Sequence, residues 1–192
     1  MGAKMREAGV TGTSEITDPV GRLLEGLARL SAVIGGLVLT FAMVVTVISI
    51  FGRALVQLGH IVPWLGWLGP VPGDFEIVEI GAAVAVAAFL PICQLRSGHV
   101  IVDLLFSKSS ERTLAVFSLV GNLLFAIVGA AITWRLYLGA LSKFRYQESS
   151  MILQIQLGWG YLALTIFFAL AVACACYLVT RQFQTIVKAK RA

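Results

Sequence analysis

Four long apolar stretches divide the chain, and short polar segments separate them. Charge-free runs cover residues 30–52, 80–95, 113–134 and 149–180. A helix rises about 1.5 Å per residue and needs about 20 residues to cross a hydrocarbon core of about 30 Å. Three of the runs have that length, and the run at 80–95 reaches it when the acidic stretch before it is included. The pattern predicts an all-α integral membrane protein with four transmembrane helices, at about 31–52, 74–95, 113–139 and 157–180.

The segments between and around these runs predict how the rest of the chain is organised. Residues 20–30 and 99–110 carry apolar side chains among polar ones, so each predicts a short amphipathic helix along the membrane surface. Residues 54–73 contain three prolines and four glycines, which would leave backbone groups unpaired in lipid and therefore predict a loop. Together these features predict one transmembrane domain over 20–182, with a disordered cytoplasmic tail at 1–19 and a basic cytoplasmic tail at 183–192.

The composition is that of a membrane protein, and the charges indicate its orientation. Of 192 residues, 58% are hydrophobic and 13% are charged, whereas a soluble domain carries about 25% charged residues. The net charge of +5 does not indicate nucleic-acid binding, because the cations lie at the ends of the predicted helices. With the N-terminus in the cytoplasm, the inner segments carry 11 Lys and Arg and the outer segments carry 4. The positive-inside rule therefore predicts that both termini are cytoplasmic.

Two glutamates open the second predicted helix. Glu76 and Glu79 are three residues apart and share a helix face, and Arg53 ends the first helix on the same side of the membrane. The favoured interpretation is a structural ion pair, either Arg53–Glu76 or Arg53–Glu79, between which the sequence does not choose. The alternative is that the carboxylates form a proton relay or a cation site, because acidic groups within membrane helices mark such pathways.

The second predicted helix also carries a packing surface. Gly81, Ala85 and Ala88 lie on one stripe of this helix. Small residues let the backbone of another helix approach closely. We therefore expect the stripe to contact a neighbouring helix.

A polar cluster follows that helix, formed by Arg96, Gly98, His99 and Asp103. The favoured interpretation is a structural lock, in which Gly98 permits a tight turn and Asp103 lies one helical turn from His99. Catalysis would need a nearby nucleophile, and the chain has no nucleotide-binding, zinc-protease or serine-hydrolase motif, so we expect no enzymatic activity. The other histidine, His60, is predicted on the opposite side of the membrane, and the three cysteines lie in apolar runs. We therefore expect neither a metal site nor a cofactor.

The chain resembles the small integral membrane subunit, of the DctQ type, of tripartite ATP-independent periplasmic (TRAP) transporters. The resemblance covers about residues 25–182, and its most specific part is a short motif at the end of the second of four helices. The matching residues are Arg96, Gly98, His99, Val100-Ile101-Val102, Asp103 and Leu104-Leu105, with Arg53, Glu76 or Glu79, and the stretch from Ser149 to Ile155 before the fourth helix. The family often has proline in that last stretch, where this chain has Gln156.

The resemblance implies a scaffold role in a three-part uptake system of the bacterial inner membrane. In the family, a soluble periplasmic protein captures an organic acid such as a carboxylate. A large multi-helix subunit then carries it across the membrane, driven by a sodium or proton gradient, and the small subunit packs beside it. The implied partners are the large subunit, the periplasmic substrate-binding protein and membrane lipids, with no nucleic acid.

Two other classes of protein fit the sequence less well. A membrane anchor of a redox enzyme would need paired histidines at mid-membrane depth, which the sequence lacks. An autonomous small channel or exporter would need polar residues on facing helices and would move solute by itself in liposomes. The nearly featureless centres of the four predicted helices favour the scaffold.

Overall fold

The structure is a computed structural model that describes residues 19–59, 71–96 and 111–191. The helices in these residues are α1 (Pro19–Gly59), α2 (Asp74–Leu95), α4 (Glu111–Arg145) and α5 (Leu157–Arg191). Each of the four is long and apolar enough to cross a membrane. Strand-like pairing in the described residues is limited to one isolated bridge, between Ser149 and Gln156. The prediction of an all-α protein with four membrane helices is therefore confirmed.

Two helices extend well beyond their predicted ends. α1 is one continuous helix of 41 residues, so the prediction of a separate surface helix at 20–30 is wrong. The predicted loop at 54–73 is wrong for residues 54–59, which form the last turns of α1. No proline interrupts the chain between that segment and the apolar run, so the ladder of helical hydrogen bonds continues through both. α5 likewise continues to Arg191, through the predicted basic tail. Residues 1–18 of the predicted disordered tail and the predicted surface helix at 99–110 lie outside the described residues.

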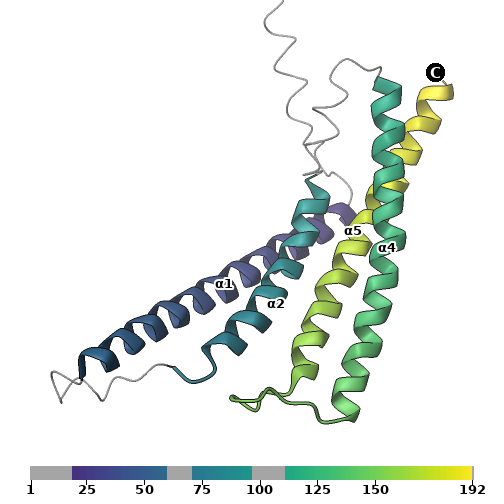
Figure 1. The fold of residues 1–192 in the computed structure, drawn as a ribbon. Helices are drawn as coiled ribbons and strands as arrows, with labels where there is room; N and C mark the ends of the chain where they lie inside the picture. Colours follow the sequence, from purple (N-terminus) through teal and green to yellow (C-terminus); the bar gives the residue numbers. More distant parts are fainter. Residues whose placement is uncertain (1–18, 60–70, 97–110, 192) are drawn as a thin grey trace, which may run out of the picture.

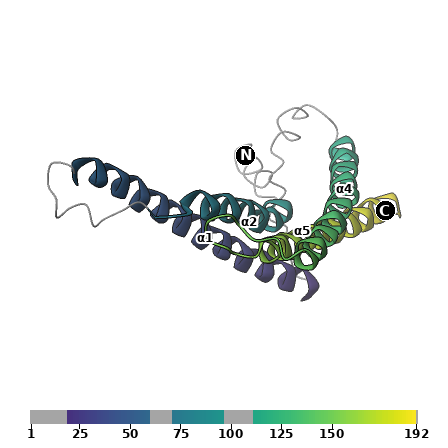
Figure 2. The same cartoon turned by 60° about the horizontal axis from the view of Figure 1, so that its bottom comes forward.

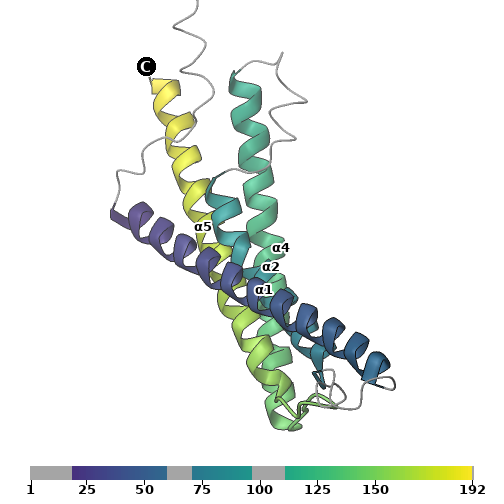
Figure 3. The same cartoon turned by 90° about the vertical axis from the view of Figure 1, so that its left-hand side faces the viewer.

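The four helices form two antiparallel pairs. α1 packs along α2, α4 packs along α5, and contacts between α2 and α5 join the pairs (Figure 1). Figure 2 shows the α1–α2 pair extending away from the α4–α5 pair, and in Figure 3 α1 crosses obliquely over α2 and α5. We call the end of the bundle with Gly59, Asp74, Arg145 and Leu157 the loop end. The opposite end, with Pro19, Leu95, Glu111 and Arg191, is the terminal end.

Small side chains fill the interior, and large apolar side chains face outward. Leucine, isoleucine, valine or phenylalanine side chains are exposed on every one of these helices. The buried apolar residues are Ala28, Ala42, Ala85, Ala87, Ala88, Ala126, Ala140, Ala171, Cys174 and Ala175. This arrangement reverses that of a water-soluble core, where large apolar residues are inside. It suits helices in lipid, where close packing of small residues drives helix association.

Glycine allows α1 and α2 to approach each other closely. A Cβ atom added to Gly35 of α1 would lie 2.9 Å from the Cβ of Ala88 and 3.2 Å from the carbonyl oxygen of Ala85. On α2, a Cβ atom added to Gly81 would lie 3.6 Å from the Cβ of Ala42. The small-residue stripe of the second helix thus lies at the interface with α1.

Candidate functional site

A buried aspartate holds α1 to α2 at the loop end. α2 begins after Gly73, whose φ of 79° is a left-handed conformation that glycine adopts readily. The next residue, Asp74, is only 8% exposed. Ser49 Oγ donates a hydrogen bond to Asp74 Oδ2 at 2.7 Å, and Arg53 Nη2 donates to the same oxygen at 2.5 Å. Ser49 and Arg53 are four residues apart, so one face of α1 presents both donors.

Arg53 therefore pairs with Asp74 and not with either of the predicted glutamates. Its guanidinium also lies over the Phe75 ring, 5.3 Å from the ring centroid, which is a cation–π geometry. The predicted bridge from Arg53 to Glu76 or Glu79 is wrong, because Asp74 is the acid that faces α1 in the first turn of α2. An ion pair between the end of α1 and the beginning of α2 is nevertheless present.

Glu76 instead fastens the segment between α4 and α5 to α2. Its carboxylate accepts a hydrogen bond from the Ser150 hydroxyl and one each from the backbone N–H groups of Ile152 and Leu153, both at 2.9 Å. Two residues of helix turn a side chain by about 200°, so Glu76 points away from the Asp74 contact with α1. Hydrogen bonds to a carboxylate are stronger than those between neutral groups, so this is a firm anchor. We call it the Glu76 latch.

The latched segment covers residues 146–156 and reaches from the α4–α5 pair to the start of α2 (Figure 1). Inside it, the backbone N–H of Ser150 donates to the carbonyl of Ile155 at 2.9 Å, which closes a turn. The turn presents apolar side chains outward, since Met151 is 93% exposed and Ile152 is 60% exposed. The latch therefore fixes the backbone of a segment whose apolar side chains Met151 and Ile152 remain uncovered.

A chain of amide side chains joins three helices at the terminal end. Gln94 Nε2 of α2 donates to Asn122 Oδ1 of α4 at 2.7 Å. Asn122 Nδ2 donates to Gln182 Oε1 of α5 at 3.2 Å, and Gln182 Nε2 donates to Ser118 Oγ at 2.9 Å. Hydrogen bonds between polar side chains of neighbouring helices stabilise helix association in lipid. The network therefore ties α2 to both helices of the other pair.

The remaining predicted site residues have simpler surroundings. Glu79 is exposed on α2 and makes no polar contact with other described residues. Arg96 follows the last residue of α2 and is also exposed. Gly98, His99 and Asp103 lie outside the described residues, so the lock that they are expected to form stays a prediction.

Threonine hydroxyl groups in the middle of the spans donate hydrogen bonds within their own helices. Thr40, Thr46, Thr133 and Thr165 each donate to a carbonyl one turn earlier in the same helix. In the part of the chain that the structure describes, no three His, Cys, Asp or Glu side chains lie together as a metal site would require. The polar groups at the two ends bond mainly to one another. This arrangement is suited to fixing the positions of the helices relative to one another.

Sequence reasoning missed several of the residues that complete these contacts. Asp74 stands two residues before Glu76, and the signal that could have identified it is the spacing of Ser49 and Arg53 on one face of the preceding helix. Gln94 and Gln182 lie within or beside apolar runs. A buried amide in such a run signals that a hydrogen-bond partner exists, but the partner is set by the packing of the helices.

A known protein family matches most of the chain. The sequence model of the family described as "Tripartite ATP-independent periplasmic transporters, DctQ component" matches residues 42–185. The matched range contains the Asp74 contact, the Glu76 latch and the amide network. No curated protein and no solved structure matches the chain.

Proposed function

The chain belongs to the DctQ-component family of TRAP transporters, and from this premise we propose that it is the scaffold that holds the large transport subunit in the membrane. A scaffold needs helices whose relative positions are fixed, and it needs a surface on which a partner can pack. It does not need a route for substrate through its own interior.

The observation that carries the proposal is the contrast between helices joined to one another by polar contacts and an uncovered apolar surface. The Asp74 contact and the Glu76 latch fix the loop end, and the amide network fixes the terminal end. Outside, α1 carries an exposed stripe of Leu30, Val33, Leu37, Phe41, Val44, Ile48 and Phe51. The stripe is about 32 Å long, which is close to the thickness of the hydrocarbon core. Such a surface can pack on another membrane subunit along the whole width of the bilayer.

The proposal includes an orientation and a set of partners. The excess of Lys and Arg near the two termini supports cytoplasmic termini, with the loop end in the periplasm of a bacterial inner membrane. The latched segment at 146–156 then lies on the side where a soluble binding protein would deliver an organic acid. The large subunit would move that acid, driven by a sodium or proton gradient. The chain itself would catalyse no reaction and hold no cofactor, and residues 20–182 would form the scaffold domain.

Co-purification with the large subunit tests the scaffold role. A tagged chain co-expressed with the large subunit should bring it down in mild detergent at a fixed stoichiometry. In proteoliposomes, uptake should require both subunits and the binding protein, whereas the chain alone should pass no solute. If the chain purifies without the large subunit and conducts solute alone, the autonomous channel or exporter replaces the scaffold.

Cysteine labelling tests the orientation separately. Met151→Cys should react with a membrane-impermeant maleimide on intact spheroplasts, because Met151 is the most exposed apolar side chain of the latched segment. Ala192→Cys should react only after the membrane is permeabilised. The chain with its own three cysteines gives the background. The reverse pattern would place the termini in the periplasm.

A further inference from the structure

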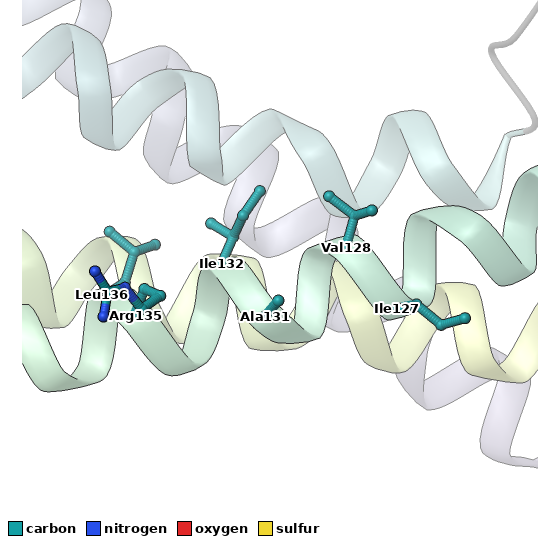
Figure 4. Close-up of a pocket in the computed structure, with 6 residues that line it drawn as sticks. All are labelled: Ile127, Val128, Ala131, Ile132, Arg135 and Leu136. Carbon is teal, nitrogen blue, oxygen red and sulfur yellow. The ribbon is translucent and has the colours of Figure 1, made fainter.

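An arginine stands at the end of an otherwise apolar groove on α4. The groove has a volume of about 460 Å³ and is lined by Ile127, Val128, Ala131, Ile132, Arg135 and Leu136 (Figure 4). These residues recur one turn apart, so the groove runs along the helix axis. Arg135 is exposed, and it makes no hydrogen bond or ion pair with the other described residues. By contrast, Arg53 already has Asp74 as its partner.

Two aromatic residues beside Arg135 indicate its depth in the membrane. Trp134 is 63% exposed and Tyr137 is 44% exposed, and their ring centroids are 6.3 Å apart. Exposed tryptophan and tyrosine side chains of membrane helices gather at the level of the lipid headgroups. Toward the terminal end, the sequence of α4 carries no charge between Arg135 and Arg112. The two rings and this charge-free stretch therefore indicate that Arg135 lies near the boundary of the hydrocarbon core on the side of the loop end.

The apolar part of the groove has nearly the length of one leaflet. Ile127 and Arg135 are eight residues apart, which corresponds to about 12 Å along the helix. Half of the hydrocarbon core is about 15 Å thick. We propose that this groove binds a phospholipid of the leaflet at the loop end, with an acyl chain along Ile127, Ala131 and Ile132 and the phosphate on Arg135. A guanidinium suits phosphate because it can offer two parallel N–H donors.

A phospholipid fits this position better than a carboxylate from another membrane helix does. A carboxylate on a partner helix would supply an anion for Arg135, but it would not supply an acyl chain for the apolar part of the groove. A lipid phosphate is already at the level of Trp134 and Arg135, and its acyl chain already lies along the core. The proposal does not rest on the scaffold role, because it concerns lipid binding to this chain alone.

Native mass spectrometry of the purified full chain in mild detergent tests the site. The probe is dioleoylphosphatidylglycerol, and dioleoylglycerol, which has the same acyl chains and no phosphate, is the control ligand. A single arginine near anionic lipid contributes enough that Arg135→Gln should bind the phospholipid about fivefold more weakly. Arg135→Lys should retain most of the binding. Arg145→Gln is the matched control, since it removes the same charge from an exposed position of the same helix beyond the groove.

The outcomes separate the proposal from its alternatives. The proposal stands if Arg135→Gln loses phospholipid binding, Arg145→Gln keeps it, and dioleoylglycerol binds the parent and all three variants equally weakly. Equal losses in the two glutamine variants would mean general attraction between a basic protein and anionic lipid, and would overturn it. Unchanged phospholipid binding in Arg135→Gln would also overturn it. Loss of the large subunit from the co-purified complex of that variant would then assign the groove to a protein partner. Because Arg135 and Arg145 are both exposed, each variant is expected to keep the helical circular dichroism spectrum of the parent.

Discussion

The distance between α1 and α2 is set where Gly35 meets Ala88, and a single methyl group there should separate the helices. Gly35→Ala would place a Cβ atom 2.9 Å from the Cβ of Ala88 and 3.2 Å from the carbonyl oxygen of Ala85. The second of these contacts is to backbone, which cannot rotate away. The neighbouring residue Gly36 provides the control, since a Cβ added there meets nothing within 4 Å.

The magnitude follows from two opposing terms. Replacing glycine by alanine inside a helix gains about 1 kcal/mol of helix propensity, and this gain is common to both variants. Forcing an extra methyl group into a packed interface costs about 1–3 kcal/mol, and this cost applies to Gly35→Ala alone. Gly36→Ala should therefore be as stable as the parent or more stable. Gly35→Ala should be less stable than Gly36→Ala by about 1–3 kcal/mol, which corresponds to roughly a 5- to 160-fold difference in the ratio of folded to unfolded protein.

The assay is reversible unfolding of the full chain in mixed micelles, with rising sodium dodecyl sulfate and tryptophan fluorescence as the readout. All three proteins are measured together, and the free energy of unfolding is compared at the same micelle composition. If Gly35→Ala and Gly36→Ala unfold at the same detergent fraction, the close approach of α1 to Ala88 does not contribute to stability. The argument from small-residue packing would then fail for this pair of helices.

Three further predictions concern the polar contacts. Arg53→Asp should lower the yield of folded protein, measured by size-exclusion chromatography. Adding Asp74→Arg to the same chain should restore the yield, whereas adding Glu76→Arg should not. Equal rescue by the two second substitutions would contradict the Arg53–Asp74 assignment. Glu76→Ala should raise the hydrogen-exchange rate of the Ile152 and Leu153 amides on the order of tenfold, while Glu79→Ala should leave that rate unchanged. An equal rise in both variants would refute the Glu76 latch. Asn122→Leu removes the middle of the amide network and should lower the free energy of unfolding in the same assay by about 0.6–2 kcal/mol. A stability equal to that of the parent would show that the network does not hold the α1–α2 pair to the α4–α5 pair.

The four spans could be predicted from the sequence because the physical requirement is simple. A run of about 20 uncharged residues is sufficient to cross the bilayer, and the runs in this chain are bounded by charges or by proline-rich segments. The small-residue stripe of α2 was equally readable, since Gly81, Ala85 and Ala88 follow helical spacing. These features depend on local sequence alone.

The partners of individual polar groups could not be predicted in this way. Arg53 had three acids within reach at the start of the next helix, and the choice of Asp74 depends on the rotation of α2 about its axis. Packing against α1 along Gly81 and Ala88 fixes that rotation, and it turns Glu76 toward a segment 74 residues away in the sequence. The continuity of α1 was missed for a different reason, since amphipathic spacing at 20–30 fits a surface helix and the start of a long spanning helix equally well.

The Glu76 latch holds two of its three donors through the polypeptide backbone and not through side chains. Every residue except proline supplies a backbone N–H, so the identities of Ile152 and Leu153 are irrelevant to these two hydrogen bonds. The exposed side chain of Ile152 can therefore be exchanged for almost any other without loosening the turn that displays it. The backbone of this segment must therefore keep its conformation, whereas its exposed side chains are free to change. The apolar surface that this segment displays can thus change while the helices beneath it keep their packing.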